Sequence, residues 1–407
     1  MTMRRIAFAV LGTILACGAP AGEKLTQAEA ETAVTAALPD LEAIRGLTFK
    51  RKVPVKVVDD AKARAYALAR FKRMTPEAKV AADTRAYQLL GLVPPGTDIL
   101  KTMLDVLEEQ AGGFYDPQTK SFYLLDDMPR AMTGPLTTHE MTHALEDQYY
   151  DIDGRIEKVL EDDDAAFAVA ALAEGSASLT MQFALRKLDA SALAAMNDTE
   201  ASRAEKLDAM PGVLRSQLLG PYILGTLFLL RGDLASISGG YPQADAKAAW
   251  DRMPRSSEQI LHPEKYWDAG KRDEPLSVTV PDPSAVLGAG WTRAGHGVLG
   301  ELTIAALVGV AAPKSRDQGA MASAAPWTSA AAAGWGGDRF ELWTKGGQAV
   351  VLLLTRWDTP ADASEFETGL HASSPSLRAR RAGTTVGVVA GGPAEKVEPL
   401  LDRLVSR

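Results

Sequence analysis

The chain is poor in cysteine and histidine and has no excess of positive charge. Its 407 residues include one cysteine, so no intramolecular disulfide can form and stability must come from packing. The formal net charge of −8 argues against nucleic-acid binding, which requires a basic surface. The sequence has no G-x-S-x-G elbow and no P-loop. With 46% apolar and 24% charged residues, the composition is typical of a globular protein with a sizeable core.

Residues 1–17 have the layout of a secretory signal peptide that ends in a lipobox. Arg4 and Arg5 form the basic start, and residues 6–16 are an apolar run that is too short to span a bilayer comfortably. Cys17 follows directly, and the pattern resembles bacterial lipoproteins, in which this cysteine becomes the acylated first residue. The alternatives are a cysteine that is removed with the signal, or a short buried helix.

The residue after the cysteine bears on localisation. Gly18 stands there rather than aspartate, which in Gram-negative lipoproteins favours the outer membrane over the inner one. We therefore expect an exported cell-envelope lipoprotein that is attached to the outer membrane by an N-terminal lipid anchor. A periplasmic or secreted protein is the alternative.

The hydrophobic pattern predicts an α+β protein with three parts after the signal. Residues 18–95 are expected to form a tether and an N-terminal helical segment, residues 96–272 a predominantly helical core, and residues 273–407 a small C-terminal α+β domain. Within these parts we expect strands at 113–115, 121–125, 339–343, 349–356 and 384–389, and helices at 27–92, 98–111, 134–149, 165–188, 360–370 and 394–405. The Ala-, Gly- and Ser-rich residues 318–337 are expected to be a linker or a loosely packed helix.

An H-E-x-x-H motif lies in one of the predicted helices. Residues four apart share a helix face, so His139 and His143 can present two imidazoles to one ion. Glu140 then lies beside the open coordination position, where it can accept a proton from an activated water and pass it to a leaving amine. Histidine occurs only five times, so a chance match is rare. The alternative is a surface helix with two histidines and no metal.

A catalytic zinc usually takes three protein ligands. Glu174 stands alone among small and apolar residues on the next predicted helix, where a buried carboxylate is costly unless it is paired or bound to metal. It could instead reach solvent. Competing third ligands are carboxylates shortly after the motif: Asp147, Asp151, Asp153 and Glu157.

One of these carboxylates has a second possible role. Asp147 lies one helical turn after His143 and could orient that imidazole through its free N–H, or it could be a surface carboxylate.

The order of these residues resembles the gluzincin clan, in which HExxH is followed by a glutamate ligand on the next helix. Residues 95–270 also resemble a family of bacterial secreted HExxH peptidases through the stretches HEMTHALEDQ (139–148), EGSA (174–177) and SEQILHPEKY (257–266). The resemblance implies a zincin-like metallopeptidase core with one Zn²⁺ per chain, held by His139, His143 and Glu174. The metzincin motif is excluded, because residues 144–154 contain no histidine.

Gluzincins also use a downstream histidine or tyrosine to stabilise the oxyanion. His262 is our candidate here, with Tyr266 and Tyr222 as alternatives, although His262 could equally be a core histidine bonded to a backbone carbonyl. By analogy of fold, the strand at 122–125 is expected to be an edge strand that pairs with an extended peptide.

The leading interpretation is a zinc-dependent metallopeptidase that hydrolyses a peptide or protein substrate at the cell envelope. A second interpretation is a non-catalytic envelope scaffold or binding protein stabilised by zinc, but such a site needs no base and Glu140 is present. A third is the hydrolysis of a non-peptide amide, such as a cell-wall link, because the same chemistry serves any amide.

Overall fold

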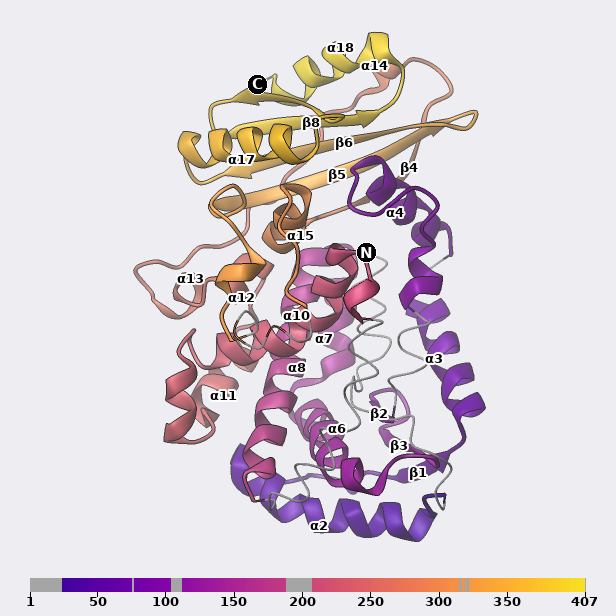
Figure 1. The fold of residues 1–407 in the computed structure, drawn as a ribbon, viewed down its shortest axis with the longest axis vertical. Coiled ribbons are helices and arrows are strands. Elements are labelled where there is room, and N and C mark those ends of the chain that lie inside the picture. Colours follow the sequence, from indigo (N-terminus) through magenta and orange to yellow (C-terminus); the bar gives the residue numbers. More distant parts are fainter. Residues whose placement is uncertain are drawn as a thin grey trace.

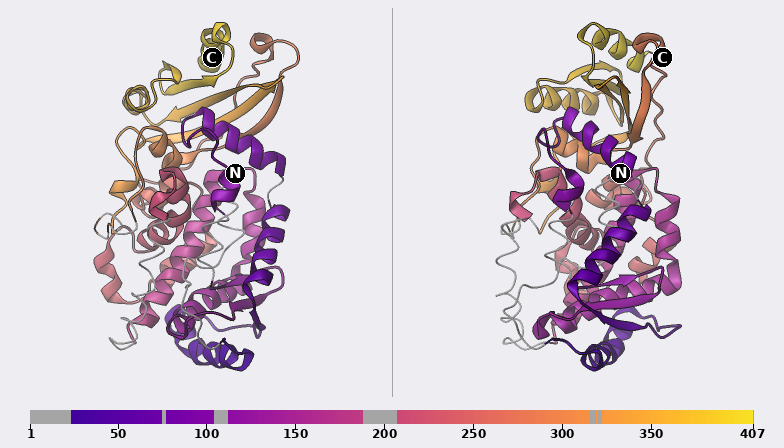
Figure 2. Two further views of the ribbon diagram at one scale, coloured as in Figure 1. Left: turned by 45° about the vertical axis from the view of Figure 1, so that its right-hand side comes forward. Right: turned by 90° about the vertical axis from the view of Figure 1, so that its right-hand side faces the viewer.

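The computed structural model describes residues 24–406 except 75–76, 104–111, 188–206, 315–316, 318 and 320–321. The expected signal peptide and Cys17 lie outside these residues, as does part of the helix expected at 98–111. Within the described part the fold is α+β, as the sequence predicts, with two separate sheets connected by long helices (Figure 1). Figure 2 shows the larger sheet at one end of the molecule in both turned views.

Most of the described helices lie outside the three-helix centre of the molecule. Those outside the central bundle are α2 (Gln27–Arg45), α3 (Asp60–Met74), α4 (Glu77–Leu89), α7 (Ile152–Lys158), α11 (Gln243–Asp251), α12 (Ser257–Leu261), α13 (Glu264–Trp267), α14 (Ser284–Leu287), α15 (Gly300–Leu307), α17 (Pro360–Ser373) and α18 (Ala394–Val405). Two 3₁₀ turns lie at Leu234–Gly239 and Ala325–Trp327. The helices expected at 360–370 and 394–405 are thus confirmed.

The smaller sheet has the order β1-β3-β2, with β1 (Val55–Val58) parallel and β2 (Gly113–Asp116) antiparallel to β3 (Ser121–Leu125). The two expected strands are confirmed, but β1 falls inside the stretch expected to be helical. Its β-branched residues favour a strand. The prediction that residues 122–125 form an edge strand is wrong. Strand β3 has a partner on each side, and β2 lies at the edge.

Three long helices form the centre of the molecule. They are α6 (Arg130–Tyr150), α8 (Asp163–Leu185) and α10 (Gly212–Leu229). Helix α6 begins four residues before the expected Gly134, after Pro129, and therefore contains Pro135. At the start of α8 the Asp162 side chain accepts hydrogen bonds from two backbone N–H groups, which caps the helix.

The larger sheet belongs to the C-terminal domain and is antiparallel, with the order β4-β5-β6-β8-β7. Its strands are β4 (Thr292–Gly297), β5 (Trp335–Lys345), β6 (Gln348–Trp357), β7 (Arg378–Ala382) and β8 (Thr385–Gly391). Both edge strands, β4 and β7, were missed by the sequence patterns. β4 contains two glycines and β7 three arginines, so neither shows a strand-like apolar alternation.

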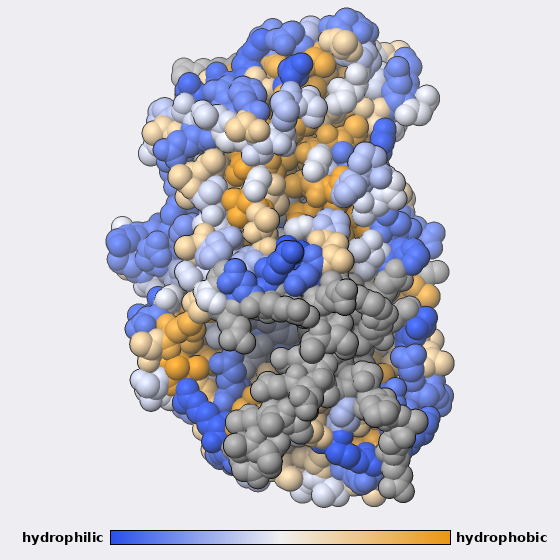
Figure 3. Space-filling model, in the orientation of Figure 1, coloured by the Kyte–Doolittle hydropathy of each residue, from blue (hydrophilic) through white to orange (hydrophobic). Residues whose placement is uncertain are grey.

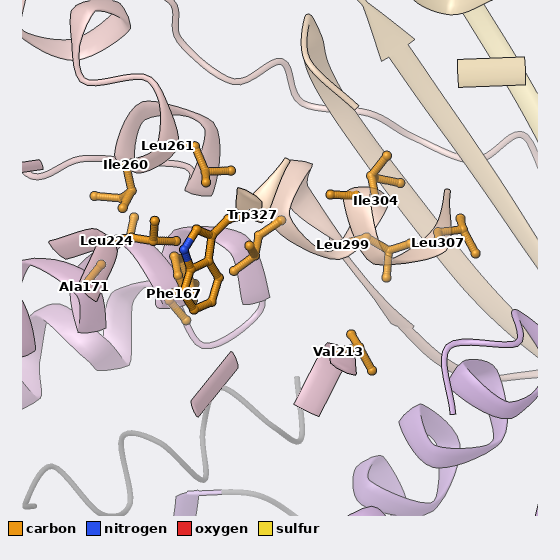
Figure 4. Packing of buried hydrophobic residues seen from close by; sticks show 14 of the residues in the cluster. Phe167, Ala171, Val213, Leu224, Ile260, Leu261, Leu299, Ile304, Leu307 and Trp327 are labelled. Atoms are coloured by element: carbon orange, nitrogen blue, oxygen red, sulfur yellow. The ribbon is translucent and has the colours of Figure 1, made fainter. Parts of the chain in front are cut away.

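A continuous hydrophobic core joins the central helices to the larger sheet. Figure 4 shows Trp327 between Phe167 and Leu224 of the central helices and Leu261 of α12. Trp327 is fully buried, so the linker or loosely packed helix expected at 318–337 is wrong for the described part of that stretch. On the face in Figure 3, hydrophobic residues gather in a hollow between the C-terminal domain and the helices below it.

Residues 18–95 do not form the separate segment that the expected boundary at 95 implied. Strand β1 belongs to the smaller sheet, while α4 packs against β4 and β6 of the larger sheet at the other end of the molecule. The approach of α4 to β4 is close: a Cβ atom added at Gly295 would lie 2.7 Å from Cβ of Ala82. The N-terminal segment therefore contacts both sheets.

One buried carboxylate predicts a pH dependence of stability. Asp338 accepts hydrogen bonds from the N–H groups of Leu299 and Gly300 and from Nε1 of Trp335, at 2.7, 2.8 and 3.0 Å. Burial nevertheless raises its pKa from 3.8 to about 6. The folded state therefore binds this proton more tightly than the unfolded chain, and the resulting stabilisation is present below pH 4 and is lost as the pH rises to about 6.

We expect the Asp338 carboxyl group to contribute on the order of 2 kcal/mol to the change in unfolding free energy across this pH window. Thermal unfolding of wild type and Asp338→Asn at pH 4, 5, 6 and 7 measures it. The variant should lack this part of the pH slope, whatever its absolute Tm. The same slope in both proteins would contradict the assignment.

Candidate metal centre

Two helices bring His139, His143 and Glu174 together. Nε2 of His139 lies 3.2 Å from Nε2 of His143 and 3.1 Å from Oε2 of Glu174, and the remaining pair of atoms is 3.5 Å apart. The two histidines are one turn apart on α6, and the glutamate comes from the middle of α8. All three side chains are buried. The residues that the sequence selected for one metal ion therefore converge.

The size and chemistry of this cluster fit zinc. Ligand atoms about 2.0–2.2 Å from a tetrahedral Zn²⁺ lie roughly 3.3–3.6 Å from one another, close to the three observed separations. Two imidazole nitrogens and one carboxylate oxygen are a usual catalytic zinc set. Burial opposes the ionisation of Glu174, but the adjacent His143 and His139 lower its pKa to about 2, so the carboxylate is an anionic donor.

Glu140 is buried beside this cluster and is held by the main chain of β2. Its Oε2 accepts a hydrogen bond of 2.8 Å from the N–H of Tyr115. Tyr115 is opposite Phe122 in the sheet, and its N–H points away from β3 towards α6. The edge of the smaller sheet thus fixes the carboxylate that follows the first histidine.

Asp147 does not orient an imidazole, contrary to the sequence-based expectation. Its Oδ2 accepts hydrogen bonds from the hydroxyl of Tyr115 at 2.8 Å and from Nζ of Lys120 at 2.7 Å, and its Oδ1 accepts from the N–H of Ile152. Nδ1 of His143 is buried and has no partner among the described residues. The β2–β3 hairpin reaches Asp147 instead, and this contact anchors the edge strand to α6.

The other proposed ligands and oxyanion residues lie apart from the cluster, with one exception. Nε2 of His262 bonds Oε1 of Glu301 at 2.9 Å, so a carboxylate rather than a backbone carbonyl satisfies it. The hydroxyl of Tyr266 donates to the carbonyl of Arg252. Asp151 caps α7, and neither it nor Asp153 or Glu157 joins the cluster.

Tyr222 is the exception. It lies on α10, is half-buried, and its ring centroid is 6.0 Å from that of His139 with an interplanar angle of 23°. Among the three residues weighed for the oxyanion, Tyr222 is therefore the one beside the three converging donors.

Two glycines allow the close helix contact that places Tyr222 here, and the sequence analysis did not identify either of them. A Cβ atom added at Gly175 would lie 2.1 Å from the carbonyl carbon of Gly225, and one added at Gly225 would lie 1.8 Å from the carbonyl oxygen of Ala171. Helices α8 and α10 can therefore touch only because both positions lack a side chain. Gly175 directly follows Glu174 and Gly225 is one turn after Tyr222, so the contact aligns two site residues.

A second group of carboxylates lies close together but surrounds a lysine. Glu258, Asp273 and Asp358 have oxygens within 4.8 Å of one another. Nζ of Lys265 lies among them, at 2.6, 2.9 and 3.0 Å respectively. The three carboxylates share this one ammonium group, and the cluster links α12 to the C-terminal domain.

The fold and the converging side chains define an α+β protein with a buried His-His-Glu cluster and an adjacent glutamate. Residues 287–399 match a family model described as a domain of unknown function (DUF8575). This match covers most of the C-terminal domain and none of the cluster. No curated protein and no solved structure matches the chain. Among the described residues, no helix is both long and apolar enough to cross a membrane.

Proposed function

We propose that this chain is a zinc-dependent metallopeptidase of the gluzincin type that hydrolyses peptide bonds at the cell envelope. The observation that carries the proposal is the convergence of His139, His143 and Glu174 at tetrahedral spacing, with Glu140 buried beside them. A zinc ion held there would polarise the scissile carbonyl and lower the pKa of water towards about 7.

The chain's own residues supply the remaining roles. Glu140 accepts a proton from the attacking water and returns it to the leaving nitrogen as the C–N bond breaks, while the N–H of Tyr115 keeps the carboxylate in place. The hydroxyl of Tyr222 donates a hydrogen bond to the developing oxyanion. Strand β2 lies at the edge of the smaller sheet, but it is buried, and the N–H of Tyr115 on its outer side is already bonded to Glu140.

The test combines metal analysis with hydrolysis assays on the full chain. We expect about one zinc per chain. The protein should also cleave casein or members of a peptide library, lose this activity after chelation and regain it with Zn²⁺ but not Mg²⁺. The magnesium sample is the matched control for ionic strength and charge. Tightly bound zinc without cleavage of any peptide would favour the scaffold interpretation, and absence of zinc would refute both.

A further inference from the structure

A buried polar cluster lies directly behind the metal centre, and we call it the Glu146 cluster. Oε1 of Glu146 on α6 accepts from Nη2 of Arg45 at 2.7 Å, from Oγ of Ser176 at 2.6 Å and from Nε1 of Trp250 at 2.8 Å. Arg45 also donates to Oγ of Ser176, and the hydroxyl of Tyr241 is 2.8 Å from that oxygen. The side chains of Arg45 and Glu146 are 2% and 0% exposed.

The cluster connects the helices that carry the proposed metal ligands. Glu146 follows His143 by three residues on α6, and Ser176 follows Glu174 by two residues on α8. The bond between Ser176 and Glu146 is therefore a direct link between α6 and α8, close to the ligands. Arg45 is the last residue of α2 and reaches both partners of that link.

The charge balance makes Arg45 essential to this link. A buried carboxylate without a cation is destabilised by its full loss of hydration. Removing one partner of a buried ion pair therefore lowers the stability of the folded protein by about 3–5 kcal/mol. Ser176 and Trp250 donate hydrogen bonds but no charge. Without Arg45, Glu146 would have to move towards solvent or accept a proton, and either change would loosen its bond to Ser176.

We propose that Arg45 is a positioning residue for the metal centre, which acts through Glu146 and Ser176 to hold α6 and α8 at the separation that lets Glu174 meet the two imidazoles. This inference rests on the proposed zinc binding. It extends the metal centre to α2, which the sequence-based division assigned to a separate N-terminal segment. Groups that support ligands from behind typically change metal affinity by about 10–100-fold.

The experiment measures zinc affinity rather than activity, by competition with a chromophoric chelator, on full-length variants at a temperature well below their Tm. Arg45→Met should raise the zinc Kd by about 10–100-fold. Arg45→Lys should give a smaller increase, because lysine keeps a positive charge for Glu146. Some increase should remain, because one ammonium group cannot reach both Glu146 and Ser176 as a guanidinium does. Ser176→Ala should also weaken binding, because it removes the direct link between α6 and α8.

The matched control is Arg215→Met. Arg215 is 5% exposed, against 4% for Arg45, and its hydrogen bonds to described residues all go to main-chain oxygens, those of Asp208, Met210, Ala312 and Pro313. This variant should lose stability without a change in zinc Kd. If Arg45→Met does not fold, Arg45→Lys and Ser176→Ala decide the matter.

Wild-type affinity in the folded Arg45 and Ser176 variants would overturn the proposal while leaving the proposed function intact. An equal loss of affinity in Arg215→Met would also overturn it, because the effect would then follow general stability. A wild-type protein that binds no zinc would refute the proposed function and this inference together.

Discussion

Replacing Glu140 with glutamine is expected to lower kcat for peptide hydrolysis by about 10³-fold. Glutamine has nearly the same shape, and its carbonyl oxygen can still accept the hydrogen bond from the N–H of Tyr115. It cannot accept a proton from water, so the loss should fall on the chemical step. Because residue 140 is not among the three converging donors, zinc content should stay at the wild-type level. Steady-state kinetics and metal analysis of the same preparation measure both quantities.

The control is the same chemical change at Glu157, an exposed residue of α7 that lies outside the HExxH motif. Glu157→Gln should hydrolyse peptide at the wild-type rate. If Glu140→Gln also kept that rate, the general base would be another group and the proposed role of Glu140 would be wrong.

Replacing Gly225 with alanine should destabilise the protein by about 3 kcal/mol, the upper end of the usual cost of overpacking. The new methyl group would lie 1.8 Å from the carbonyl oxygen and 2.7 Å from the carbonyl carbon of Ala171. These are backbone atoms of α8, so no side-chain rotation relieves the clash and the two helices must separate. Tyr222 is one turn away on α10 and would move with it, so hydrolysis should fall in the protein that still folds. Guanidinium unfolding gives the change in free energy.

Gly134→Ala is the matched control for this prediction. Gly134 is an exposed residue of α6, and an added Cβ atom would lie more than 4 Å from every other element of the described structure. Alanine is the better helix former by about 1 kcal/mol, but Pro135 follows and disfavours helical backbone for a residue that has a Cβ atom, so this variant should stay close to wild-type stability. Similar destabilisation by both substitutions would show that helix contact is not the reason for the glycine at 225.

The local part of the candidate site could be predicted because it depends on helical spacing. Two histidines four residues apart must share a face, and an isolated glutamate in an apolar helix needs a partner. Both statements concern residues that are near one another in sequence. The helices α17 and α18 and the strands β2 and β3 were accessible for the same reason, since each has its own apolar pattern, whereas the stretch expected to be helical at 27–92 contains β1.

The parts that failed depend on contacts between distant elements. Asp147 does lie on the same helix as His143, but the hairpin that reaches its carboxylate could not be inferred from that spacing. His262 belongs to a stretch that resembles a peptidase family, yet Glu301, a residue of the C-terminal domain, holds it. Arg45 is 131 residues from Ser176, and no local pattern marks that pairing.

The position of the N-terminal segment also constrains how the chain can fold. Helix α4 leaves the ribosome early, but its partners β4 and β6 in the larger sheet are complete only when Trp357, the last residue of β6, has been made. Contacts of such long sequence separation carry a high loop-closure entropy and slow the folding rate. The apolar side of α4 therefore stays exposed until the chain has been synthesised beyond β6. We therefore expect the chain to depend on chaperones during this interval, while the apolar side of α4 is exposed.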